Sequence, residues 1–217
     1  MSEITLPNLL LCEGPSDISF FRNLIAIRNL PIFSIRDTSP KRGSAGGNSK
    51  FGDKLKALRT DRGWPRVRHL LVVADNDEDP ADSFNYVRNQ LAAVLGVANV
   101  PKGPLVRQAV TNSLSLQIVM VPWTDEQGNL ETMCITPARN AQKAVGTHVD
   151  NFAAVTKADS WQSLSRRNEM WLRSNLAARC KTDPFVPLGI VFQDHKDLIP
   201  LKDKSFDRLA NVLESYR

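Results

Sequence analysis

Two apolar segments that lie far apart in the sequence both end abruptly in acidic residues. Residues 7–12 lead into Glu13, and residues 69–74 lead into Asp75 and Asp77. Short apolar runs are typical of buried parallel strands, whose carboxyl ends meet at one ligand-binding edge of a sheet. Clustered carboxylates repel one another and favour a neutralising cation, and oxygen ligands suit Mg²⁺ or Mn²⁺. The sequence therefore predicts a divalent-metal site for phosphate chemistry at this edge.

The acidic segment at residues 75–80 also has a simpler interpretation. Its sequence, DNDEDP, can form a polar turn whose aspartates cap a helix that begins at Pro80. An isolated Asp-x-Asp pair favours this capping role. The presence of Glu13 at the end of another expected strand shifts the balance towards the metal site.

The elements that position these acids alternate between strands and helices. This order predicts an α/β fold with a doubly wound, mainly parallel sheet and a C-terminal helical extension. Helices are expected to begin at Pro80 and Leu130, and residues 97–113 are expected to be irregular. Strands are expected at residues 7–12, 31–36, 69–75 and 116–121, and the expected domains are residues 1–136 and a helical extension, 137–217, packed on the first.

Composition excludes several classes of protein. The 217 residues can bury a sizeable core, and 42% hydrophobic and 24% charged residues are ordinary for a globular chain. We see neither a secretion signal nor an apolar run near the roughly 20 residues of a membrane helix. The isolated Cys12, Cys134 and Cys180 indicate reduced thiols in a cytoplasmic protein, and no His/Cys cluster indicates zinc.

Positive charge is concentrated in one part of the chain. The net charge is +5, and residues 36–68 contain ten Lys and Arg against three acids. Such a segment favours polyanions such as nucleic acid, although a solvated basic helix face is an equal alternative. A glycine-rich stretch within it places Lys41, Arg42 and Lys50 where they could contact a nucleic-acid backbone. This stretch does not match the P-loop pattern, so a flexible loop without a ligand is the other interpretation.

The order of these features resembles the Toprim domain. An apolar strand with Glu-Gly at its end, then Asp17 and two phenylalanines, and later a strand with Asp-x-Asp, is similar to that domain in topoisomerases, bacterial primases, small ribonucleases and overcoming-lysogenization-defect nucleases. More narrowly, IVMVPWTDEQGNLETMCI at residues 118–135 and the segment 172–192 resemble small stand-alone Toprim-like proteins of uncharacterised function. Residues 1–136 are accordingly expected to be a Toprim-like domain.

The resemblance implies roles for individual acids. Glu13 corresponds to the glutamate that binds metal or acts in general acid–base catalysis, and Asp17 matches an acid of nuclease-type Toprim proteins. Glu131 is either an additional ligand or an acid in the first turn of a helix, where the helix dipole favours it. The implied metal ligands are Glu13, Asp75, Asp77, Asp79 and Glu131.

The function implied by the resemblance is an Mg²⁺- or Mn²⁺-dependent nuclease, an endonuclease or ribonuclease acting on DNA or RNA. Related Toprim nucleases work beside or within an ABC-type ATPase, including in phage defence, so such a partner is expected by analogy of fold. A nucleic-acid-binding or regulatory module that does not cleave is the main alternative. A primase-like nucleotidyl transferase ranks last, and homo-oligomer formation is left open.

Overall fold

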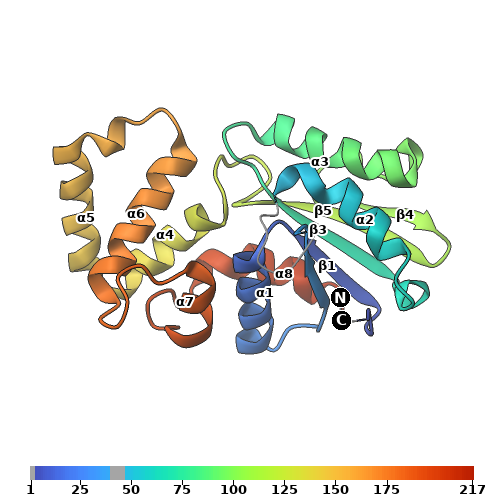
Figure 1. Cartoon of the computed structure of the whole chain (residues 1–217), viewed down its shortest axis with the longest axis horizontal. Helices are drawn as coiled ribbons and strands as arrows, with labels where there is room; N and C mark the ends of the chain where they lie inside the picture. The colour runs from blue at the N-terminus through green and yellow to red at the C-terminus, as the bar shows by residue number, and fades with distance from the viewer. Residues whose placement is uncertain (1–2, 40–46) are drawn as a thin grey trace.

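The computed structural model describes residues 3–39 and 47–217, which form a five-stranded sheet with helices on both faces (Figure 1). The strand order is β2-β1-β3-β5-β4. All neighbouring pairs are parallel except β4 with β5, which is antiparallel. The expected α/β fold with a mainly parallel sheet and a C-terminal helical region is confirmed. The strands are β1 (Asn8–Cys12), β2 (Ser34–Asp37), β3 (His69–Asp75), β4 (Arg107–Thr111) and β5 (Leu114–Val121).

The expectation that residues 97–113 are irregular is wrong. Strand β4 lies in this segment at the edge of the sheet, and most of its residues are partly or fully exposed. It pairs with β5 from Arg107 opposite Gln117 to Thr111 opposite Leu114, and a two-residue turn joins the strands. The sequence RQAVT has no continuous apolar run, so the strand depends on its hairpin partner for stability.

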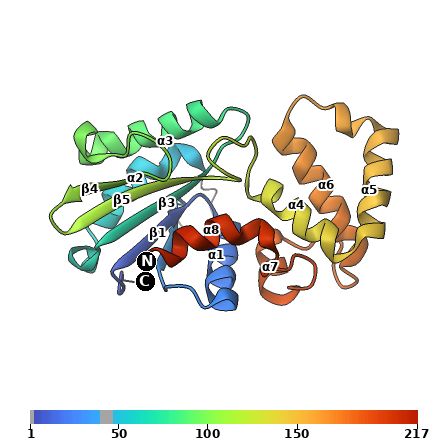
Figure 2. The same cartoon turned by 180° about the vertical axis from the view of Figure 1, so that it is seen from behind.

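Helices on the two faces of the sheet bury two separate clusters of side chains. Helices α2 (Phe51–Arg59) and α3 (Pro80–Leu95) cover one face, and α1 (Pro15–Arg28) and α8 (Asp207–Glu214) cover the other (Figures 1 and 2). Because both faces of β1 and β3 are covered, the central residues of these strands are apolar. The first cluster includes Leu9, Leu11, Leu55, Val72 and Leu91, and the second includes Leu10, Phe20, Leu71, Leu209 and Leu213.

The C-terminal helices lie mainly beyond one end of the strands. Helices α4 (Leu130–Ala141), α5 (Lys143–Thr156) and α6 (Leu164–Arg179) form a group there, and α7 (Leu188–Asp194) packs against α1 (Figures 1 and 2). The expected domain boundary between residues 136 and 137 falls inside α4, and the division stays a prediction. The described single-turn 3₁₀ helices are Asn48–Lys50, Trp64–Arg66, Val97–Asn99, Ala158–Ser160 and Lys204–Phe206.

The end of the chain returns to the sheet. The Tyr216 hydroxyl donates a hydrogen bond of 2.6 Å to Oε1 of Gln117 on β5, and Asn8 Nδ2 on β1 donates to the Tyr216 carbonyl at 3.3 Å. These contacts join the last residues to two strands. Over the described ranges, no helix is both long and apolar enough to cross a membrane.

Replacing Leu10 tests the core beneath β1. Leu10 is fully buried in the cluster shared with α1 and α8, so Leu10→Ala is expected to lower the free energy of unfolding by about 2–5 kcal/mol. Urea denaturation followed by circular dichroism measures the change. The control is Val155→Ala on α5, where the side chain is 84% exposed and the expected change is within about 0.5 kcal/mol. Equal losses in the two variants would contradict the core assignment.

Candidate functional site at the carboxyl edge of the sheet

Strands β1 and β3 are neighbours, which brings together the acids at their carboxyl ends. Leu11 lies opposite Val72 in the parallel register. Beyond this pair, Oε1 of Glu13 accepts a hydrogen bond of 2.9 Å from the backbone N–H of Asp75, across 62 residues of sequence. The expected adjacency of strands β1 and β3 is confirmed, and it brings the Glu13 carboxylate to the backbone of Asp75. Convergence of the carboxylates of Glu13, Asp75 and Asp77 on one ion stays a prediction. We call this part of the molecule, with Glu13, Asp17, Asp75, Asp77 and Glu131, the acidic edge.

Asp75 joins the end of β3 to the start of α4. Its Oδ1 accepts a hydrogen bond of 3.1 Å from the backbone N–H of Leu130. Burial raises the pKa of Asp75 well above its usual value, and the charges of Glu13 and Asp17, followed by Glu131, raise it further. Loss of water and nearby like charges both disfavour a carboxylate. Positive charge brought close to Asp75 would favour its ionised form.

Asp17 comes from a different element, the first turn of α1. Its Oδ2 accepts a hydrogen bond of 2.7 Å from the backbone N–H of Gly14, so the side chain also closes the start of the helix. Burial raises the pKa of Asp17 from 3.8 to about 7, opposed by the Gly14 hydrogen bond and assisted by the charges of Glu131 and Asp37. The charge of this side chain consequently changes near neutral pH.

Glu131 occupies the helix position that one of its two interpretations from the sequence requires. It lies in the first turn of α4, directly after Leu130. Burial raises its pKa, and its own charge raises the pKa of Asp17 and of Asp75, so it belongs to the acidic edge. Its use as a metal ligand stays a prediction.

The loop after β3 gives its two remaining aspartates different surroundings. Asp77 has a left-handed backbone (φ 48°), and its N–H and C=O form hydrogen bonds of 2.8 and 2.7 Å with Gly128. Burial is the main cause that raises the pKa of Asp77, and the charge of Glu78 raises it further. Asp79 instead caps α3, because its Oδ1 accepts hydrogen bonds of 3.0 Å from the N–H groups of Ala81 and Asp82. This is the capping role that was the alternative for this loop, so we leave Asp79 out of the ligand set proposed below.

Sequence reasoning missed two charged residues beside the acidic edge. Asp37 ends β2 opposite Cys12, and its charge raises the pKa of Asp17. Lys54 of α2 is buried, and its Nζ donates a hydrogen bond of 2.9 Å to the carbonyl of Ser39. Burial lowers the pKa of Lys54, while the charge of Asp37 raises it. Asp37 had a usable signal, since it directly follows the strand expected at residues 31–36, whereas the burial of Lys54 depends on tertiary packing.

Buried thiols lie close to the same acids. Cys12 and Cys134 are free cysteines, and burial raises the pKa of both thiols well above the usual value. Nearby carboxylates raise both further, with Asp17 the largest for Cys12 and Glu131 the largest for Cys134. Without metal these raised pKa values disfavour the thiolate form, and the hard donors of the edge are the carboxylate oxygens.

The chemistry of these donors fits Mg²⁺ or Mn²⁺, which prefer carboxylate oxygens. Their spacing is looser than a finished metal site. Within residues 3–39 and 47–217, no three His, Cys, Asp or Glu side chains are close enough to hold one ion. Metal binding at the acidic edge therefore requires the carboxylates to move towards one another.

The basic residues predicted to bind nucleic acid cannot all be placed. Lys41 and Arg42 lie outside the described residues. Lys50 is exposed at the end of the 3₁₀ turn that precedes α2. Its role in binding stays a prediction.

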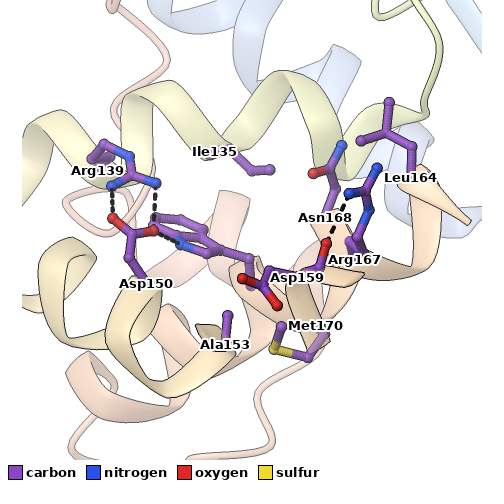
Figure 3. A pocket seen from close by; sticks show the side chains of 10 residues that line it. Ile135, Arg139, Asp150, Ala153, Asp159, Leu164, Arg167, Asn168 and Met170 are labelled. Atoms are coloured by element: carbon purple, nitrogen blue, oxygen red, sulfur yellow. Dashed lines mark hydrogen bonds and ion pairs between the residues drawn. The ribbon is translucent and has the colours of Figure 1, made fainter. Parts of the chain in front are cut away.

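A cavity of about 340 Å³ lies among helices α4, α5 and α6 (Figure 3). In its wall Arg139 forms two hydrogen bonds, of 2.5 and 2.9 Å, with the carboxylate of Asp150. Trp171 Nε1 donates to the same carboxylate at 2.8 Å. Since these opposite charges are paired with each other, the cavity has a different chemistry from the acidic edge.

Comparison with known proteins gives one family. A family model described as "Protein of unknown function (DUF3226)" matches residues 7–198. The match includes the acidic edge and most of the helices beyond it. Neither a curated protein nor a solved structure gave a match.

The raised pKa of Asp17 predicts how stability depends on pH. The folded protein holds this proton up to about pH 7, whereas the unfolded chain releases it near 3.8. The stabilisation is complete below the lower value and is lost as pH rises through the higher one. Without divalent metal, the melting temperature of the wild type should fall over this range, and Asp17→Asn should flatten the fall. Identical pH profiles for the two proteins would contradict a protonated Asp17.

The same acids predict how added metal changes stability. Mg²⁺ should raise the melting temperature more at about pH 8 than at about pH 5, because metal binds the ionised carboxylates and stabilises the folded state by mass action. Thermal denaturation with and without Mg²⁺ measures this difference. A shift of equal size at both pH values would point to binding away from the acidic edge.

Proposed function

We propose a function for this chain, which belongs to the DUF3226 family of proteins of unknown function. From the chemistry of its acidic edge, we infer that it is an Mg²⁺- or Mn²⁺-dependent nuclease that hydrolyses phosphodiester bonds of DNA or RNA. One observation supports this most strongly. The Glu13 side chain contacts the backbone of Asp75 at the carboxyl ends of adjacent parallel strands, and burial followed by the surrounding acids disfavours ionisation of Asp75. This is an edge where α/β proteins bind ligands, with a charge that a divalent cation would neutralise.

A relationship to the Toprim domain is part of the proposal. In support, the acids implied by the resemblance follow the first and third strands, which are adjacent as the resemblance requires. Asp17 and Glu131 were selected from the same resemblance, and the proposal is supported by the effect of both charges on the pKa of Asp75. The relationship rests on this arrangement and on the sequence motifs.

The proposed roles follow from the position of each side chain. Glu13, Asp75 and Asp77 hold the metal ion, with Glu131 added from α4. When bound, the ion supplies Lewis-acid activation of a phosphate group and of a water molecule. Asp17 is suited to holding and releasing a proton at its carboxyl group near neutral pH, since its pKa is about 7.

The proposed partners come from charge and from the resemblance. Lys41, Arg42 and Lys50 neutralise backbone phosphates of the nucleic acid. An ABC-type ATPase partner and a role in phage defence follow from the resemblance to Toprim nucleases. Assembly of the chain with itself stays open.

A second candidate is a Toprim-like module that binds nucleic acid or a regulatory partner without cleaving it. One observation favours it: no three potential ligands in the described part of the chain are close enough for one ion. Asp75 is also engaged with the N–H of Leu130. If these contacts persist in solution with Mg²⁺, the acidic edge is a structural feature and no cleavage follows.

Conservative replacement of the two central acids separates these functions. Asp75→Asn and Glu13→Gln are expected to lower Mg²⁺-dependent cleavage about 100-fold or more, because each removes a charged metal ligand. Both variants should fold as well as the wild type, since each removes a repelling charge. The assay uses end-labelled DNA and RNA with Mg²⁺, Mn²⁺ or a chelator.

Asp125→Asn provides the matched control, because Asp125 is exposed in the neighbouring loop. Its cleavage rate should equal that of the wild type. Cleavage that persists unchanged in Asp75→Asn would count against the nuclease. Nucleic-acid binding without any cleavage by the wild type would favour the second candidate.

The three basic residues proposed to contact nucleic acid predict how its binding depends on salt. Changing Lys41, Arg42 and Lys50 together to alanine should reduce the log–log slope of affinity against salt by about 0.9 for each lost contact on duplex DNA. Fluorescence anisotropy over a salt series measures the slope. Alanine at the exposed Lys102, Lys181 and Lys196 gives the same net charge and should leave the slope unchanged. Equal slopes for the two triple variants would place the contact surface elsewhere.

A further inference from the structure

Glu78 connects the acidic edge to helix α6. It follows Asp77 in the loop after β3, and its carboxylate accepts hydrogen bonds from the Ser163 hydroxyl and from the backbone N–H groups of Leu164 (3.2 Å) and Ser165 (3.4 Å). These groups lie 85–87 residues away in the sequence. Glu78 therefore provides from a distant loop the acceptor that the first N–H groups of a helix need.

The backbone around Glu78 is held on its other side by the loop between β5 and α4. Gln127 Nε2 donates a hydrogen bond of 2.7 Å to the carbonyl of Glu78, and Gly128 exchanges two backbone hydrogen bonds with Asp77. Asp77 has a positive φ, which a side-chain-bearing residue adopts only when its surroundings hold it there. The Asp77 segment is thus fixed between this loop and α6.

Helix α6 also contacts the start of α4. Asn168 Nδ2 donates a hydrogen bond of 3.0 Å to the hydroxyl of Thr132, which itself bonds to the cap residue Asn129. The next residue, Leu130, donates to Asp75. Helix α6 therefore contacts both the loop that carries Asp77 and Glu78 and the start of α4, which bonds to Asp75.

We propose that Glu78 is a positioning residue, which holds the Asp77 and Asp75 carboxylates in place by anchoring their loop to α6. The functional consequence of this anchoring rests on the proposed metal site. At that site, the C-terminal helices would determine the metal affinity of the acidic edge. Glu78 is not a metal ligand in this arrangement, since its carboxylate faces the donors of α6. Groups that orient metal ligands typically change metal affinity by about 10–100-fold when removed.

Amide hydrogen exchange tests the anchoring independently of any metal. In Glu78→Ala, exchange should become about tenfold faster both in residues 75–79 and at the start of α6, the size expected for loss of a capping contact. Ser163→Ala removes the reciprocal hydroxyl and should accelerate exchange in the same two segments. Glu126→Gln is the control, because Glu126 is an exposed acid paired with Arg208 at 2.9 Å. Acceleration at α6 alone, with residues 75–79 unchanged, would overturn the inference.

Titration with Mn²⁺ alone then tests the consequence. The dissociation constant should rise about tenfold or more in Glu78→Ala, and in the same direction but less in Ser163→Ala. If Glu78 were itself a ligand, Ser163→Ala would leave Mn²⁺ affinity unchanged, and the positioning role would be wrong. Wild-type protein that binds no Mn²⁺ would overturn the proposed function, while the exchange measurements would still decide whether Glu78 anchors the loop.

Discussion

The contact between Glu13 and Asp75 is the constraint on which the rest of the acidic edge depends. It requires β1 and β3 to be adjacent, parallel and in register, because any other pairing would separate two acids that are 62 residues apart. The apolar residues of both strands, buried beneath helices on each face, enforce that register. Packing of the core therefore holds together acidic side chains that repel one another.

The chain partly compensates this repulsion with the positive ends of helices. Backbone N–H groups at the starts of α1 and α4 donate to Asp17 and Asp75. Asp79 caps α3, and Glu78 accepts from the start of α6. An acid near a helix N-terminus gains about 0.3–1 kcal/mol. The pKa of Asp17 nevertheless rises to about 7, because burial raises it by more than the hydrogen bond from Gly14 lowers it. A divalent cation would act on charge that the protein itself leaves uncompensated.

The sequence predicted the parts of this arrangement that depend on local pattern. Continuous apolar runs identified β1 and β3, and the acids after them followed from strand direction. Strand β4 was missed because its alternating, mostly exposed residues are stabilised by pairing with β5 and not by their own pattern. Glu78 was not singled out for the same reason, since its partners are residues 163–165 and no feature of the DNDEDP segment points to them. Non-local hydrogen bonds are thus the information that pattern reasoning lacks.

The Leu130–Asp75 hydrogen bond places the two candidate functions in direct competition. As long as Oδ1 of Asp75 accepts from the start of α4, that oxygen is used to join a helix to the sheet. Binding a cation must draw oxygens of several acids towards one point, because in the described residues no three are close enough. Burial and like charges both oppose ionisation of Asp75, and a bound cation would offset the like-charge part of that cost. The same Asp75 oxygen is therefore the point at which the two candidate functions differ: in one it continues to join α4 to the sheet, and in the other it turns to a bound cation.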